Sequence, residues 1–237
     1  MSKPNQTNKH LNPKLPRLGA IMFWLVFFTT HFITCFWITW IALSKWDFGY
    51  AIAYDLIGSE SHIAQFAPKN IHKAGFEAVT RDQHIELFGQ INWSVHHPGL
   101  GLSDISYTLA NGNNESLLHQ AEVIHLQDVA NLIDQFYATS FVSLAIFLLF
   151  LASAMKAKIA FPSTIKIMTG FVSVLVSSCF AILIIGPTKV FYWAHTVVFP
   201  PENQWFFYYE ESLMTTLMKA PDLFAFIEML LLAGFII

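Results

Sequence analysis

Two short motifs in this sequence carry side chains that could move protons. In the first, Glu122, His125 and Asp128 follow one another at intervals of three residues. On a helix, residues three apart share a face, so Asp128 can accept a hydrogen bond from one ring nitrogen of His125. The other ring nitrogen is then free to act as a general base. The alternative interpretation is a solvated polar stripe along a helix at the membrane interface.

The second motif centres on His195, which follows Tyr192 and precedes a series of aromatic residues that includes Phe199 and Trp205. An aromatic surface of this kind suits acyl chains. We therefore expect Tyr192, Phe199 and Trp205, with Glu122, to shape the binding site of a lipid-bearing substrate. The alternative is an aromatic belt at the level of the lipid headgroups, in which His195 has no role.

A metal site has less support than proton transfer. His119, Glu122 and His125 share a helical stripe, but the two histidines are six residues apart, whereas helical zinc pairs are typically four apart. The sequence therefore predicts neither a metal site nor a metal cofactor.

The composition restricts the class of protein. Of the 237 residues, 54% are hydrophobic and 12% are charged, about half the usual charged fraction of a soluble domain. So few charges cannot cover a water-soluble surface, and no basic stripe is available for nucleic acid.

Apolar segments of membrane-spanning length position both motifs. Residues 18–44, 135–155 and 167–188 are uncharged, and residues 222–237 contain a shorter apolar run. Because lipid cannot satisfy backbone polar groups, these segments must be helical. The sequence predicts an all-α membrane protein with four transmembrane helices.

The charges predict the orientation of these helices. The tail over residues 1–17 and the loop over residues 156–166 are basic, whereas residues 45–134 carry a net charge of −7 and the loop over residues 189–221 is also acidic. Cytoplasmic segments are enriched in Lys and Arg. We expect both termini inside and a large extracytoplasmic loop domain over residues 45–134. Within that domain, residues 81–95 and a segment beginning near Asn113 or Asn114 are expected to be helical.

The two motifs resemble those of the bacterial lipoprotein intramolecular transacylases, which are four-helix integral membrane proteins. That family carries Glu-x-x-His-Met-x-Asp-Val before its second transmembrane helix, and here Leu126 replaces the Met. Its second signature is Phe-His, an aromatic pair, a Trp and Leu-Pro-x-x-Phe-Phe. The corresponding residues here are Ala194-His195, Val198-Phe199, Trp205 and Ala220-Pro221-Asp222-Leu223-Phe224.

The resemblance implies transfer of the sn-2 acyl chain of a diacylglyceryl-cysteine lipoprotein to its own α-amine. The product is a lyso-form lipoprotein. A neutral imidazole can take the proton of such an amine, whose ordinary pKa is about 7.7–8.0. We expect His125 to be the base, oriented by Asp128, and His195 to stabilise the oxyanion or protonate the leaving oxygen, although the two roles could be exchanged.

The expected partners are bacterial lipoproteins and membrane lipids, at the extracytoplasmic face of the bacterial cytoplasmic membrane, with no cofactor. Two other functions remain open at this point. The same aromatic surface could serve a non-catalytic lipid- or lipoprotein-binding membrane protein. A metal-dependent membrane hydrolase is the second alternative.

Overall fold

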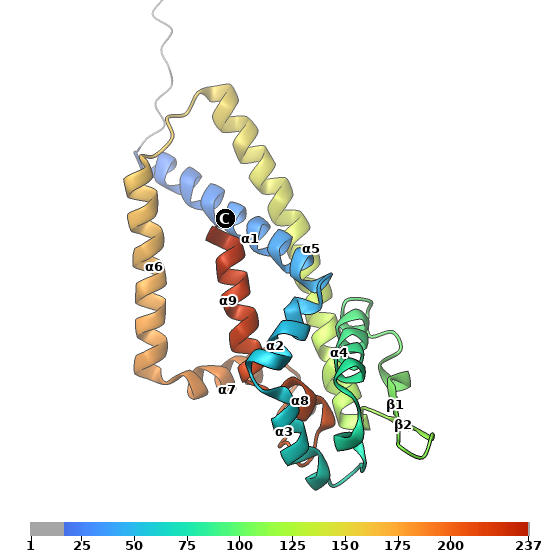
Figure 1. The fold of residues 1–237 in the computed structure, drawn as a ribbon. Coiled ribbons are helices and arrows are strands. Elements are labelled where there is room, and N and C mark those ends of the chain that lie inside the picture. The colour runs from blue at the N-terminus through green and yellow to red at the C-terminus, as the bar shows by residue number, and fades with distance from the viewer. Residues whose placement is uncertain (1–16, 237) are drawn as a thin grey trace, which may run out of the picture.

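The computed structural model describes residues 17–236, so nearly all of the expected N-terminal tail lies outside the described residues. This part of the chain is mostly helical (Figure 1). Its α-helices are α1 (Arg17–Ser44), α2 (Tyr50–Leu56), α3 (Ser59–Phe66), α4 (Arg81–Val95), α5 (Gln120–Ala157), α6 (Thr164–Ile185), α7 (Pro187–Val198), α8 (Leu213–Met218) and α9 (Asp222–Ile236). Short 3-10 turns lie at Asp47–Gly49, Ala67–Lys69, Phe76–Ala78 and Leu102–Asp104.

Three helices are long and apolar enough to cross a membrane, namely α1 from Leu18, α5 and α6. They correspond to the first three expected spans. The fourth expected span is α9, whose 15 residues rise only about 22 Å, less than a typical hydrocarbon core of about 30 Å. A membrane-crossing role for α9 therefore stays a prediction.

Helix α5 is a single helix of 38 residues, which makes it about 57 Å long. Its N-terminal third carries the polar motif and its remainder is apolar, so one rigid element connects the motif to the membrane. Within the apolar part it packs on α1, where the rings of Trp37 and Phe141 lie 4.6 Å apart. At the same interface the Ser143 hydroxyl donates a hydrogen bond to the Thr30 carbonyl oxygen, at 3.2 Å.

The start of α5 differs from the sequence-based expectation. The expected first residues, near Asn113 and Asn114, instead belong to a hairpin of β1 (Ser106–Thr108) and β2 (Asn114–Ser116), which pair antiparallel. The helix begins six residues later, after His119, whose side chain accepts a hydrogen bond from the Ala121 amide. The expectation was wrong because pairing with residues 106–108 holds residues 114–116 in an extended conformation.

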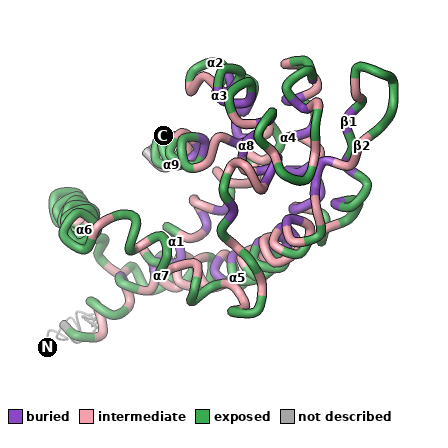
Figure 2. The backbone as a smooth tube through the Cα atoms, turned by 90° about the horizontal axis from the view of Figure 1, so that it is seen from below, coloured by how far each residue is buried: buried purple, intermediate pink, exposed green. Residues whose placement is uncertain are grey.

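Most buried side chains gather where residues 48–133 pack against α8 and α9 (Figure 2). The largest fully buried aromatic side chains there are those of Tyr50, Tyr54 and Phe76. The Tyr50 hydroxyl also donates a hydrogen bond to the Leu217 carbonyl oxygen of α8, at 2.6 Å. Segments far apart in the sequence therefore share one core, which fixes the N-terminal part of α5 against α8.

Helices α6 and α7 have a different character, since neither contains a buried residue. An apolar helix of 22 residues without buried side chains is typical of a helix that contacts lipid. At its end Gly186 adopts a positive φ of 97°, Pro187 opens α7, and α7 turns sharply away from the axis of α6 (Figure 1). Most of this segment was expected to be part of the loop over residues 189–221, and it forms a short helix that carries His195.

Candidate active site

The structure brings the two predicted histidines together around one phenylalanine. The ring centroid of Phe199, directly after α7, lies 5.0 Å from that of His125 on α5 and 5.4 Å from that of His195 on α7. Both imidazoles are half-buried. Because 70 residues separate them in the sequence, only the tertiary fold makes them neighbours.

His195 has a defined tautomer. Its Nδ1 lies 2.8 Å from the Phe191 carbonyl oxygen, which can only accept, so Nδ1 carries a proton. In the neutral ring, Nε2 therefore holds the lone pair and can accept a proton. The rings of Phe191 and Trp205, with centroids at 4.0 and 4.9 Å, hold the imidazole in place.

His125 and Asp128 do not form the hydrogen bond that their spacing predicts. Asp128 Oδ2 instead accepts a hydrogen bond from Asn203 Nδ2 at 2.7 Å, and Nδ1 of His125 is buried without a hydrogen-bond partner. The expectation failed because helical spacing cannot show that Asn203, in the segment after α7, donates a hydrogen bond to the Asp128 carboxylate. The His125 ring packs instead on Phe199 and on Phe207, whose centroid is 5.9 Å away.

Glu122 lies in a hydrogen-bond network that joins α5 to α8. Its carboxylate is 1% exposed and accepts hydrogen bonds from the His119 amide at 2.7 Å, the Ser212 hydroxyl at 2.5 Å and the Met214 amide at 3.1 Å. The first of these bonds belongs to a capping box at the start of α5. With both carboxylate oxygens engaged, Glu122 holds the start of α5 against α8.

The aromatic residues predicted for substrate binding form a surface beside His195. The Trp205 ring lies 5.3 Å from Tyr192 and 4.9 Å from His195, between centroids. Tyr192 also contacts Phe206, at 5.7 Å, and is 40% exposed. The geometry offers an apolar surface next to a proton-accepting nitrogen.

A cavity of about 170 Å³ opens next to the histidines. Its polar wall is one face of α5, with Asp128, Asn131 and Gln135, and Leu132 lies beside them. The opposite wall is Val198, Phe199 and Pro200. Asn131 and Gln135 were not among the predicted site residues, although their spacing from Asp128, three and seven residues, continues the polar face of His125 and could have indicated them.

The family model described as Lipoprotein intramolecular transacylase Lit matches residues 105–220. Over this segment, about half of the chain, the protein is similar to that family. The segment contains His125, Asp128, His195 and Trp205, so the resemblance inferred from the two motifs is confirmed. No curated protein and no solved structure matches the chain.

The match to the Lit family implies lipoprotein intramolecular transacylase activity, lipoprotein substrates and a bacterial membrane protein, in agreement with the candidate membrane helices. Among residues 17–236, no three His, Cys, Asp or Glu side chains form a group that could hold a metal ion. His119, one of the residues considered for such a site, uses Nδ1 to accept the Ala121 amide.

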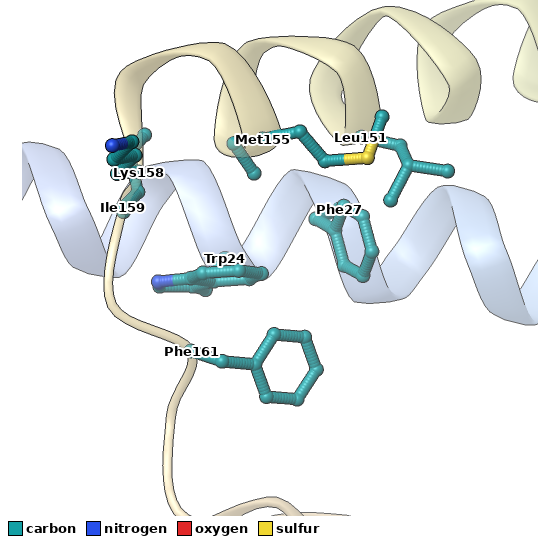
Figure 3. Close-up of a pocket in the computed structure, with 8 residues that line it drawn as sticks. Trp24, Phe27, Leu151, Met155, Lys158, Ile159 and Phe161 are labelled. Carbon is teal, nitrogen blue, oxygen red and sulfur yellow. The ribbon is translucent and has the colours of Figure 1, made fainter.

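A larger cavity, of about 340 Å³, lies at the opposite end of α1 and α5 (Figure 3). Trp24, Phe27, Leu151 and Phe161 line it, with Lys158 at its edge. From His125 to Leu151 the rise along α5 is about 39 Å. No histidine or carboxylate lines this cavity, so the smaller cavity beside His125, within the segment that matches the Lit family, is the candidate active site.

Proposed function

We propose that this chain transfers the sn-2 acyl chain of a diacylglyceryl-cysteine lipoprotein to the α-amine of the same cysteine. The observation that carries the proposal is the pair His125 and His195 on either side of Phe199, within the segment that matches the family. The product is a lyso-form lipoprotein, which carries an N-acyl group and a monoacylglyceryl group.

The reaction needs only acid–base chemistry. The amine nitrogen attacks the ester carbonyl carbon, the new C–N bond forms, and the amine proton passes to an imidazole nitrogen. The C–O bond to glycerol then breaks, and the glycerol oxygen takes up a proton from an imidazole. An ester becomes an amide with no net change in protons or electrons. Because amine and ester belong to one molecule, their high effective concentration reduces the need for a covalent enzyme intermediate.

The two histidines divide these proton transfers. The hydrogen bond from Nδ1 of His195 to Phe191 leaves Nε2 with its lone pair, which favours His195 as the base. His125 then stabilises the oxyanion or protonates the leaving oxygen. The reverse assignment depended on an Asp128–His125 hydrogen bond, and Asp128 bonds to Asn203 instead.

The aromatic surface supports a lipid-bearing substrate. Tyr192 and Trp205 lie next to His195 and expose apolar area to an acyl chain. We place Glu122 in a supporting role, since its buried carboxylate holds the start of α5 and with it His125.

The charge distribution supports a site on the extracytoplasmic face of the bacterial cytoplasmic membrane. The basic loop over residues 156–166 faces the cytoplasm and the acidic segments that carry the two histidines face outward. Side-specific labelling of single cysteines at positions 111 and 158 tests this orientation, and labelling of both positions from one side would contradict it.

The function is tested with His125→Ala and His195→Ala. Each purified variant is reconstituted with a diacylated lipopeptide, and mass spectrometry follows the acyl group from glycerol to the amine. We expect the initial rate to fall at least a hundredfold in both variants, because each loses a proton-transfer group.

The matched control is His97→Ala, which removes an exposed histidine at the end of α4 and should leave the rate unchanged. Normal rates in both site variants would refute the mechanism. If the wild-type protein binds the lipopeptide but transfers no acyl group, the result would instead favour a non-catalytic lipoprotein-binding protein.

A further inference from the structure

Asp128 lines the smaller cavity, and in the described part of the chain it forms no ion pair with a basic side chain. One carboxylate oxygen, Oδ2, accepts the Asn203 hydrogen bond at 2.7 Å. Within residues 17–236, no Lys, Arg or His nitrogen lies within the 4.0 Å that an ion pair with Asp128 requires. The carboxylate therefore has capacity to bind a positively charged group from outside the chain.

The cavity wall around Asp128 is rich in hydrogen-bond acceptors. Asn131 and Gln135 follow on the same face of α5, and each has an amide oxygen. Asn131 Oδ1 also accepts from Gln127 Nε2, at 3.2 Å, which holds its acceptor side in place. One carboxylate and two amide side chains along one helical face therefore offer several acceptors to a group with several N–H bonds.

The size and the lining of the cavity restrict which cation fits. A volume of about 170 Å³ accommodates a few heavy atoms and excludes a folded peptide segment. A quaternary ammonium would need an aromatic cage, but the only aromatic ring lining the cavity is that of Phe199. A primary ammonium has three N–H donors and forms strong, charge-assisted hydrogen bonds with a carboxylate.

We propose that Asp128, with the amides of Asn131 and Gln135, binds the α-ammonium group of the substrate's N-terminal cysteine. This inference rests on the proposed function, because it assigns the cavity to one end of the same substrate. Phe199 lines the cavity and contacts both histidines, so the bound amine lies beside the groups that exchange its proton.

The assignment gives the cavity a role in selecting substrate over product. Acylation converts the ammonium into a neutral amide with one N–H group, so the product loses the ionic contact with Asp128. A lipoprotein that is already N-acylated also lacks the ammonium charge, so we expect it to bind weakly.

The test measures binding without turnover. The ligand is a lipopeptide whose two ester bonds are replaced by ethers, prepared with a free or an acetylated N-terminus, and affinities are measured in nanodiscs at pH 6.5. Wild-type protein should bind the free amine at least tenfold more tightly than the acetylated form. Asp128→Asn keeps an oxygen for Asn203 and should bind the two ligands equally.

The control variant is Asp134→Asn, which removes an exposed carboxylate on the same helix that does not line the cavity, and it should keep the preference. Asp128→Glu should keep a preference severalfold above that of Asp128→Asn. Equal affinities in wild-type protein, or a tenfold preference in Asp128→Asn, would overturn the inference. Since the ether ligand cannot transfer an acyl chain, this result is independent of the His125→Ala and His195→Ala rates, which test the proposed function.

Discussion

Two residues of one motif, Glu122 and His125, have different surroundings in this site. His125 and Glu122 are one turn apart on α5, yet the imidazole faces an aromatic cluster while the carboxylate is buried among backbone and hydroxyl donors. The Glu-x-x-His spacing therefore combines the residue that we propose for proton transfer with one that holds the helix end in place.

Glu122→Ala is expected to destabilise the fold by roughly 3 kcal/mol or more, because two buried donors and one partly buried donor lose their acceptor. Thermal unfolding in detergent measures the loss. Glu122→Gln keeps one acceptor oxygen and should lose less. A Glu122→Ala protein of normal stability with a strongly reduced rate would show that Glu122 acts on the substrate instead.

The elements explain which parts of the site could be predicted from the sequence. The apolar runs of α1 and α6 identify them, because hydropathy is a local property of each segment. The meeting of His125 and His195 depends on the turn at Gly186 and on the packing of α7, which no local pattern contains. The role of Asp128 in the site stays a prediction, and its hydrogen-bond partner Asn203, which lies in a distant loop, could not be predicted from local spacing.

The contact between α1 and α9 depends on Gly234. A Cβ atom at this position would lie 2.4 Å from Thr39 Cγ2, closer than two carbon atoms can pack. Small residues permit this close approach of membrane helices. We expect Gly234→Leu to separate the helices and lower stability by about 1–3 kcal/mol, measured by thermal unfolding in detergent.

The matched control for this substitution is Gly170→Leu on α6, where an added Cβ meets no atom within 4 Å. It should unfold at the wild-type temperature. If both variants lose the same stability, the cost arises from replacing a helical glycine by leucine and not from the α1–α9 contact.

At the scale of the whole molecule, several histidines make folding sensitive to acid. His84 is buried, with Nδ1 3.0 Å from the Tyr54 hydroxyl, and burial lowers its pKa to about 4. Burial also lowers the pKa of His62 and His96. A histidine with a depressed folded-state pKa binds a proton more readily when the chain is unfolded.

The stability contributed by neutral His84 is therefore complete above pH 6.5 and is lost as the pH falls from 6.5 towards 4. The full loss is up to about 3 kcal/mol. Unfolding at pH 7.5 and pH 4.5 should show a smaller difference for His84→Gln than for wild-type protein. His97→Gln, at an exposed position, should match wild type, and equal differences in all three proteins would contradict the assignment.

The continuity of α5 sets the distance between the reaction and the bilayer. His125 is ten residues from the uncharged stretch that begins at Gln135, so about 15 Å of unbroken helix lies between the imidazole and the hydrocarbon boundary. This distance along the helix axis is fixed as long as the helix is unbroken. In the proposed reaction, the glycerol ester therefore has to rise out of the lipid to reach His125. Each residue inserted into this part of α5 would raise that histidine by 1.5 Å and rotate it by about 100° away from its partner.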